Sequence, residues 1–114
     1  MRVNYFTPTR MIRELEPLLI GQHIAVTASI GALIDGGVKG SSYMASKHAL
    51  LSYLSSLRQE YIKYKKDITV SIGCPYVINT TMAQGYKTKM DFLLPALDQK
   101  YVAQTLISEF VARK

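Results

Sequence analysis

Tyr43 and Lys47 are the residues of this chain whose types and spacing could carry out chemistry. They stand four positions apart in the segment Tyr-Met-Ala-Ser-Lys, and on a helix such a pair shares one face. An ammonium close to a phenol favours the phenolate, so this phenol could give or take a proton near neutral pH. The spacing alone is a weak signal, because Tyr61 and Lys65 repeat it. The surroundings must therefore decide between the two pairs.

Two strands and a long helix are predicted around the first pair. Residues 23–30 are rich in β-branched residues and read as a strand that is largely apolar on both faces, typical of a parallel sheet, and residues 68–74 read as a second strand. Residues 31–40 form a glycine-rich loop, and residues 41–66 form the longest helix candidate. Strand, loop, helix and strand make a βαβ crossover, so the two strands should be parallel neighbours.

The helix over 41–66 admits two interpretations. Ser41 or Ser42 is expected to cap its start. Its apolar residues spread over more than one face, and small residues along it would let another helix pack closely: Ala45, Ser46, Ala49, Ser52, Ser55 and Ser56. The helix could therefore contact both a sheet and a second subunit, or be a surface helix with one buried side.

The flanking segments predict two more helices and a loop. Residues 3–20 show helical periodicity, with Pro8 as a kink or as the true start. Residues 76–97 read as a mobile loop with short helical turns, and Asp98 should cap a last helix over about 99–112.

Ligands of parallel α/β sheets bind at the carboxyl ends of the strands. Ser29 and the segment after Pro75 follow the two strand ends, and Tyr43 and Lys47 begin the helix between them. Tyr61 lies about 27 Å further along that helix, at roughly 1.5 Å per residue, and should therefore be at the opposite edge.

Composition limits the alternatives. The 114 residues are 48% hydrophobic, enough for one small domain with a core. The net charge of +6 permits an acidic partner. The densest basic cluster, however, falls where a helix should end, and it consists of Lys63, Lys65 and Lys66. This position favours a solvated helix end over a nucleic-acid patch. Cys74 has no internal partner and suits a cytosolic-facing protein. No apolar run is long enough for a membrane span, and no signal-peptide pattern opens the sequence.

Four ordered motifs resemble the carboxyl-terminal half of a short-chain dehydrogenase/reductase, over nearly the whole chain. They are Val3-Asn4, Thr27-Ala28-Ser29, Tyr43 to Lys47, and Cys74-Pro75 to Thr80. Within that family, residues 74–85 and 93–111 are similar to the retinol dehydrogenase branch of the epidermal type, followed by the 17β-hydroxysteroid dehydrogenases of types 11 and 13. The resemblance implies an α/β fold, a partial Rossmann-like domain over 1–114 with two strands of a doubly wound parallel sheet and flanking helices.

The resemblance also implies a role for each matching residue. Tyr43 would be the general acid/base, Lys47 would favour its phenolate and hold the nicotinamide ribose, and Ser29 would hydrogen-bond the substrate oxygen. Asn4 would support a water-linked proton relay that ends at Lys47. Tyr43 and Lys47 would also contact the cofactor, NAD or NADP, together with three residues after the second strand: Pro75, Ile78 and Thr80.

Structural roles compete with these functional ones. Ser29 could be a plain turn residue, and Asn4 or Thr80 could cap a helix. Four features depart from the family pattern. Ser29 precedes Tyr43 by 14 residues where the family usually has 13, Tyr76 replaces a glycine, and the connection from the first helix to the first strand is shorter than usual. The TGxxxGxG loop of the amino-terminal half is absent.

The implied activity is oxidation or reduction between a hydroxyl and a carbonyl on an apolar substrate such as retinol or a steroid. In the complete enzyme, a homodimer through residues 41–66 and a place at the surface of the endoplasmic reticulum or of lipid droplets are expected. Without the amino-terminal cofactor-binding half, this chain should be inactive by itself, and the residues that choose between NAD and NADP lie in that half. The alternatives are a non-enzymatic partner that pairs with a full-length relative through residues 41–66, and a basic nucleic-acid module, which the even charge distribution disfavours.

Overall fold

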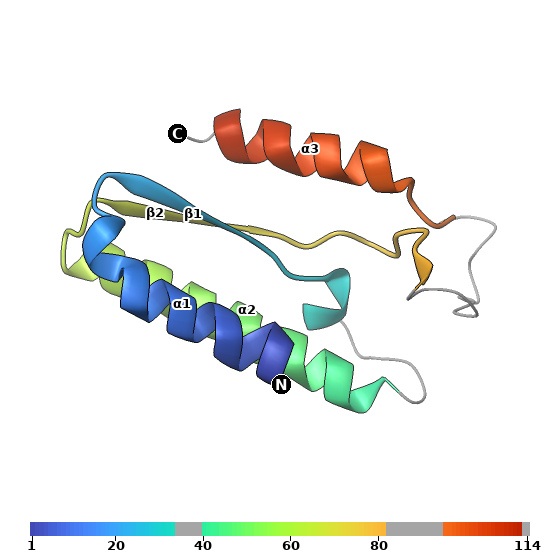
Figure 1. Ribbon diagram of the computed structural model, residues 1–114, viewed down its shortest axis with the longest axis horizontal. Coiled ribbons are helices and arrows are strands. Elements are labelled where there is room, and N and C mark those ends of the chain that lie inside the picture. Colours follow the sequence, from blue (N-terminus) through green and yellow to red (C-terminus); the bar gives the residue numbers. More distant parts are fainter. Residues whose placement is uncertain (34–39, 82–94, 113–114) are drawn as a thin grey trace. The chain divides into compact units, whose positions relative to one another are not determined.

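The computed structural model describes residues 1–33, 40–81 and 95–112 (Figure 1). These residues form two compact units, 1–74 and 75–114, and each unit is described by itself. The first unit holds η1 (Arg2–Phe6), α1 (Thr7–Leu15), η2 (Glu16–Leu18), β1 (Gln22–Thr27), η3 (Ile30–Ala32), α2 (Ser41–Lys63) and β2 (Ile68–Gly73). The second unit holds α3 (Gln99–Ala112).

The two strands pair in parallel, as the crossover predicts. Gln22 lies opposite Ile68, and the register continues to Thr27 opposite Gly73. The first strand ends earlier than the expected 23–30, because Ser29 starts the 3₁₀ turn η3. The fold is therefore α/β with a parallel βαβ unit, and the end of β1 leads directly into the turn that carries Ser29.

The start of α2 differs from the prediction. Gly40 is the N-cap, and no side chain caps the helix, so the expected cap by Ser41 or Ser42 is wrong. Both serines are instead the first residues inside the helix, where their side chains are exposed. The first turn closes through the backbone, since Met44 N–H donates to Gly40 O at 2.9 Å.

The other end of α2 is a Schellman motif. The helix stops at Lys63, three residues before the predicted end, because Lys65 takes a positive φ of 52°. Lys66 N–H donates to Tyr61 O at 2.9 Å, and Lys65 N–H donates to Ile62 O at 3.2 Å. These bonds satisfy carbonyls that the end of a helix would otherwise leave unpaired.

The helical segment at the amino terminus has three parts. A π-turn, η1, leads into α1, and the short 3₁₀ turn η2 ends the segment at Leu18. Pro8 lies in the first turn of α1, where its missing N–H does no harm. Pro8 therefore marks the start of the α-helical part, one of the two predicted alternatives.

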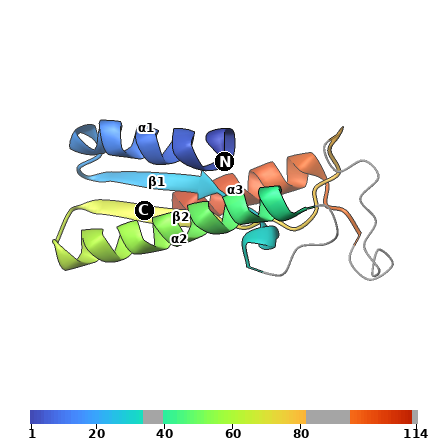
Figure 2. The same cartoon turned by 90° about the horizontal axis from the view of Figure 1, so that it is seen from below.

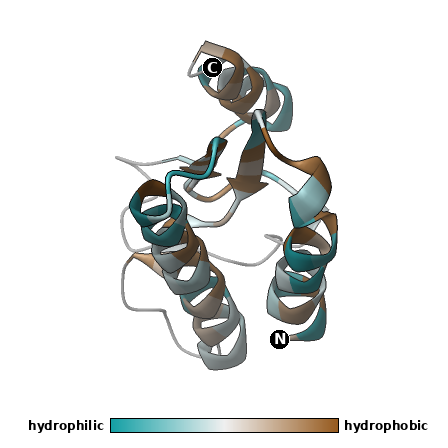
Figure 3. Cartoon of the chain, turned by 90° about the vertical axis from the view of Figure 1, so that its left-hand side faces the viewer, coloured by the Kyte–Doolittle hydropathy of each residue, from teal (hydrophilic) through white to brown (hydrophobic). Residues whose placement is uncertain are grey.

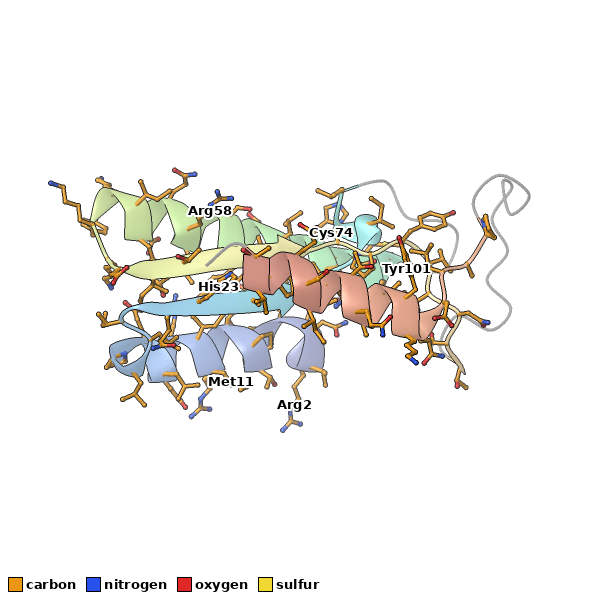
Figure 4. All side chains as sticks on the ribbon, turned by 90° about the horizontal axis from the view of Figure 1, so that it is seen from above. Arg2, Met11, His23, Arg58, Cys74 and Tyr101 are labelled. Carbon is orange, nitrogen blue, oxygen red and sulfur yellow. The ribbon has the colours of Figure 1, made fainter. Side chains whose placement is uncertain are left out.

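Helices α1 and α2 lie on one face of the first unit's sheet (Figures 2 and 3). The buried core between them and the strands consists of Ile12, Ile24, Leu50, Leu54, Leu57, Tyr61, Ile68 and Val70. Met11 of α1 and Arg58 of α2 point away from the strands (Figure 4). The sheet and the two helices thus form two layers, and the core between them fixes the direction in which α2 runs.

Among its described residues, the second unit contains a short parallel bridge and the helix α3. Ile78 pairs with Leu97, and α3 follows. The predicted cap is confirmed, since Tyr101 N–H donates to Asp98 Oδ1 at 2.9 Å. Within the predicted loop 76–97, residues 82–94 lie outside the described residues.

Candidate active site

Tyr43 and Lys47 lie on one face of the first turns of α2. The Lys47 ammonium is 5.9 Å from the centroid of the Tyr43 ring, in a cation–π contact. Tyr43 is 38% exposed, and Lys47 is half-buried. A phenol that solvent can reach, next to a positive charge, is suited to exchange protons with a small molecule.

Asn4 reaches this turn from the π-turn η1. Its Nδ2 donates to Ser46 Oγ at 3.0 Å, and Ser46 Oγ donates to the Tyr43 carbonyl at 2.6 Å. Asn4 lies inside η1, whose N-cap is Met1, so the alternative of a capping role for Asn4 is wrong. Two segments 42 residues apart in sequence are thus joined beside the tyrosine.

Ser46 is the residue whose role the sequence analysis missed. We expected it, with other small residues, to let a second helix approach, but it is only 1% exposed and faces the interior of the first unit. The available signal was its position three residues after Tyr43, on the side of the helix where a hydroxyl can bond the preceding turn.

Ser29 is held in the turn that follows β1. Its backbone is extended, with φ −165° and ψ 152°, and its Oγ accepts the Gly31 N–H at 3.2 Å. Ser29 therefore has the role of a turn residue, which was its structural alternative. Because its Oγ only accepts in this bond, the hydroxyl proton can still be donated to another acceptor.

Gly31 links the turn η3 to the start of α2. A Cβ at Gly31 would lie 2.5 Å from Met44 Sδ and 3.5 Å from Ser29 Oγ. Met44 directly follows Tyr43, so the turn that holds Ser29 packs against the first turn of the helix that holds the tyrosine. The absence of a side chain at Gly31 is what permits this close approach.

The repeated pair, Tyr61 and Lys65, has a structural role. Tyr61 is 2% exposed and belongs to the core, and its hydroxyl has no hydrogen-bond partner. Burial, with a smaller effect of Glu16, raises the pKa of Tyr61 to about 12. Lys65 lies beyond the end of α2, and the ammonium over the Tyr61 ring, at 5.5 Å, belongs to Lys66. This pair therefore lacks both an accessible phenol and the shared helix face.

The three expected cofactor contacts after β2 belong to the second unit. Asn79 N–H donates to Leu97 O at 2.9 Å, and Leu97 N–H donates to Val77 O at 2.8 Å. In this pattern the peptide groups of Ile78 point away from Leu97. Pro75 and Thr80 flank the bridged segment and are half-buried. That Pro75, Ile78 and Thr80 share a cofactor site with Tyr43 stays a prediction.

The first unit also has a groove between its helices, away from the candidate site. It encloses about 380 Å³ and is lined by Arg13, Glu16, Tyr53, Ser56, Leu57 and Glu60. Tyr53 lies about 15 Å along α2 from Tyr43, at roughly 1.5 Å per residue. Among residues 1–33, 40–81 and 95–112, no group of three or more His, Cys, Asp or Glu side chains is placed to hold a metal ion.

The family model for short chain dehydrogenases matches residues 1–91, so the chain belongs to the short-chain dehydrogenase family. Epidermal retinol dehydrogenase 2 of Mus musculus is 36% identical over 110 residues, covering 92% of this chain and 35% of that protein. Short-chain dehydrogenase/reductase family 16C member 6 of Bos taurus is 37% identical over 87 residues, covering 75% of this chain and 27% of that protein. These relatives confirm the expected branch of the family.

A more distant relative and two solved structures extend this result. Fatty acyl-CoA reductase of Acinetobacter baylyi is 34% identical over 117 residues, covering 99% of this chain and 38% of that protein. A short chain dehydrogenase from Burkholderia cenocepacia in complex with NADP has a TM-score of 0.73 at 27% identity, covering 93% of this chain and 42% of that one. A second, from Burkholderia phymatum in complex with NAD, shares the fold with a TM-score of 0.64 at 24% identity, covering 93% of this chain and 40% of that one.

This chain spans about a third of the length of the curated relatives that it matches. Within the described residues, no helix combines the length and the apolar character needed to cross a membrane.

Proposed function

We propose that these residues supply the proton-transfer half of an NAD(P)-dependent oxidoreductase that interconverts a hydroxyl and a carbonyl on an apolar substrate such as retinol or a steroid. The observation that carries the proposal is the exposed Tyr43 phenol, with the Lys47 ammonium 5.9 Å from its ring. The names of the relatives support an apolar substrate, since they include retinol dehydrogenases and a fatty acyl-CoA reductase.

In this proposal Tyr43 takes the hydroxyl proton during oxidation and returns it during reduction. The positive charge of Lys47 stabilises the negative charge that develops on the phenol oxygen. Ser29, on a turn packed against the start of α2, donates a hydrogen bond to the substrate oxygen. Asn4 supports the proton path to Lys47 from η1.

Each of the two units has groups chemically suited to one end of a nicotinamide cofactor. Lys47 has an ammonium with donors for ribose hydroxyls, and the peptide groups of Ile78 point away from the bridge to Leu97, where a carboxamide could bind. Pro75 and Thr80 would border that contact. The nicotinamide, when bound, accepts or gives the hydride. The sequence has no TGxxxGxG loop to hold the pyrophosphate of the cofactor. We therefore propose that the 114 residues by themselves do not catalyse turnover of the substrate.

The test is Tyr43→Phe in an enzyme in which an amino-terminal cofactor-binding half precedes these residues, for example the corresponding half of the mouse relative. We expect turnover of an apolar alcohol to fall by roughly 10²- to 10⁴-fold, because general acid–base catalysis contributes about that much. Binding of NAD(P)H, measured by fluorescence, should stay unchanged.

The matched control is Tyr61→Phe, the same substitution in the repeated pair. Because Tyr61 is buried in the core, turnover should remain near the wild-type rate. Wild-type turnover in Tyr43→Phe would overturn the assignment of Tyr43.

A second candidate role is pairing between subunits through α2, either as a homodimer or with a full-length relative. The exposed side of α2 carries small side chains that would let another helix approach: Ala45, Ser52, Ser55 and Ser56. Charging that side in Ser52→Glu/Ser55→Glu should abolish pairing in sedimentation velocity, and Ser108→Glu on α3 is the control. Pairing that survives the double substitution would exclude α2 as the interface.

We also propose that the protein acts at the cytosolic face of the endoplasmic reticulum or of lipid droplets. The half-buried free thiol of Cys74 agrees with a reducing compartment. Fractionation of cells that express a tagged chain tests the location, and recovery from the secretory lumen would contradict it.

A further inference from the structure

Ser46 has the most buried polar side chain among the described residues, with 1% of its surface exposed. Its hydroxyl is used twice: Oγ donates to the Tyr43 carbonyl at 2.6 Å and accepts from Asn4 Nδ2 at 3.0 Å. A buried hydroxyl with both a donor and an acceptor satisfied is held in one orientation. Ser46 therefore forms a fixed link between η1 and the first turn of α2.

The carbonyl that Ser46 binds also connects the candidate pair. In an α-helix the carbonyl of residue 43 accepts the N–H of residue 47. The Ser46 hydroxyl thus bonds the one carbonyl that joins the peptides of Tyr43 and Lys47. The hydrogen bond from this hydroxyl therefore acts on the stretch of backbone from which both side chains project.

The partner of Ser46 lies on an unusual turn. In η1 the N–H groups of Tyr5 and Phe6 both donate to the Met1 carbonyl, at 2.8 and 3.2 Å. Such π-turns are uncommon and frequently occur at functional sites. The turn carries Asn4, whose side chain reaches across to α2.

We propose that Ser46 is a positioning residue. It couples Asn4 to the Tyr43–Lys47 turn and thereby sets where the phenol and the ammonium point. Only the catalytic consequence of this inference rests on the proposed function, since the coupling itself belongs to the first unit.

The coupling is tested on the 114-residue chain by NMR. The Tyr43 ring should shift the ε-methylene protons of Lys47, and the Tyr43→Leu variant measures that shift. We expect Ser46→Ala to abolish the ring-dependent shift in the folded state, and Asn4→Ala to do the same. The double variant should add nothing further, and Ser46→Thr, which keeps a hydroxyl, should restore the shift.

The control is Ser55→Ala, the same substitution at an exposed site of α2. A variant that only lost stability would show fewer folded molecules with an unchanged folded-state shift. An unchanged shift in both folded Ser46→Ala and folded Asn4→Ala overturns the proposal, and Asn4→Ala decides alone if Ser46→Ala does not fold.

The catalytic consequence is tested in the enzyme with an amino-terminal half. Ser46→Ala should lower kcat by about ten- to hundred-fold, the loss expected from a small misplacement of a catalytic group, and should change KM less than about two-fold. An unchanged kcat would overturn the catalytic consequence. If Tyr43→Phe leaves turnover intact, the proposed function fails while the Lys47 shift still decides the coupling.

Discussion

Tyr43 and Tyr61 show how strongly the surroundings of a residue decide what it can do. Both start a Tyr-x-x-x-Lys segment in the sequence. Tyr43 is 38% exposed and has its own lysine over the ring, whereas Tyr61 is 2% exposed and its hydroxyl has no partner. The same four-residue spacing thus belongs once to a candidate acid/base and once to the core.

The buried phenol of Tyr61 predicts a pH dependence of stability. Its pKa rises from 10.0 to about 12 through burial, so the folded chain keeps this proton to higher pH than the unfolded chain does. The free energy of unfolding is therefore independent of this titration below about pH 10 and declines between about pH 10 and 12, by roughly 1.4 kcal/mol per pH unit. In urea titrations over this range, Tyr61→Phe should lose less stability than the wild type.

At neutral pH, Tyr61→Phe should leave the free energy of unfolding unchanged or raise it by up to about 1 kcal/mol, because it removes a buried hydroxyl with no partner. Tyr64→Phe, on a ring that is 64% exposed, is the matched control. Wild-type and Tyr61→Phe curves that coincide from pH 10 to 12 would contradict the interpretation.

At the scale of elements, the ends of helices determine where the site begins and where the core closes. Gly40 begins α2, and this places Tyr43 in its first turn, beside η3. Lys65, two residues after the end of α2, takes a left-handed conformation and turns the chain toward β2. These two points set the length of α2.

The left-handed position predicts a stabilising substitution. Lys65→Gly should raise the free energy of unfolding by roughly 1 kcal/mol, because a residue with a Cβ is strained at positive φ and glycine is not. Lys63→Gly removes the same charge inside the last turn of α2 and should lower stability by about 1 kcal/mol. Equal effects of the two substitutions in urea unfolding would contradict this reading of the helix end.

The cap of α3 gives an independent prediction for the second unit. Asp98→Ala removes the acceptor of the Tyr101 N–H and should destabilise the helix by about 1 kcal/mol. Asp98→Asn keeps a capping oxygen and should retain most of the helix. Amide exchange over residues 99–104 measures the difference, and identical exchange in both variants would exclude the capping role.

At the scale of the molecule, the described residues form a two-stranded parallel sheet with helices on one face in the first unit. Both edges of such a sheet leave backbone groups unpaired, and so small a sheet gives limited stability. The chain belongs to a family of oxidoreductases and spans about a third of the matching relatives. The candidate proton-transfer groups, Tyr43 and Lys47, thus belong to a small unit with a two-stranded sheet.

This arrangement predicts weak cofactor binding by the 114 residues alone. We expect the dissociation constants of NADH and NADPH to lie far above the micromolar range, because this sequence has no TGxxxGxG loop to hold the pyrophosphate at a helix N-terminus. Isothermal titration calorimetry measures these dissociation constants for the chain alone and for the enzyme that has an amino-terminal half. A micromolar constant for the isolated chain would contradict the prediction.

The sequence by itself determined the order of elements, the parallel crossover, the capping of α3 by Asp98 and the family. These follow from local signals, since hydrophobic periodicity, turn residues and short motifs act within a few positions of each other. The placement of Tyr43 and Lys47 on one face was predictable for the same reason.

Only the tertiary structure decided that Ser46 is buried against Asn4, that Tyr61 lies in the core and that Gly40 caps α2. Each of the first two depends on packing between segments far apart in sequence. The third depends on the backbone of Gly40, whose carbonyl accepts the Met44 N–H while neither adjacent serine caps the helix. A single sequence shows which side chains are near in the chain. It does not show which side of a helix the rest of the molecule will cover, and that cover separates the accessible Tyr43 from the buried Tyr61.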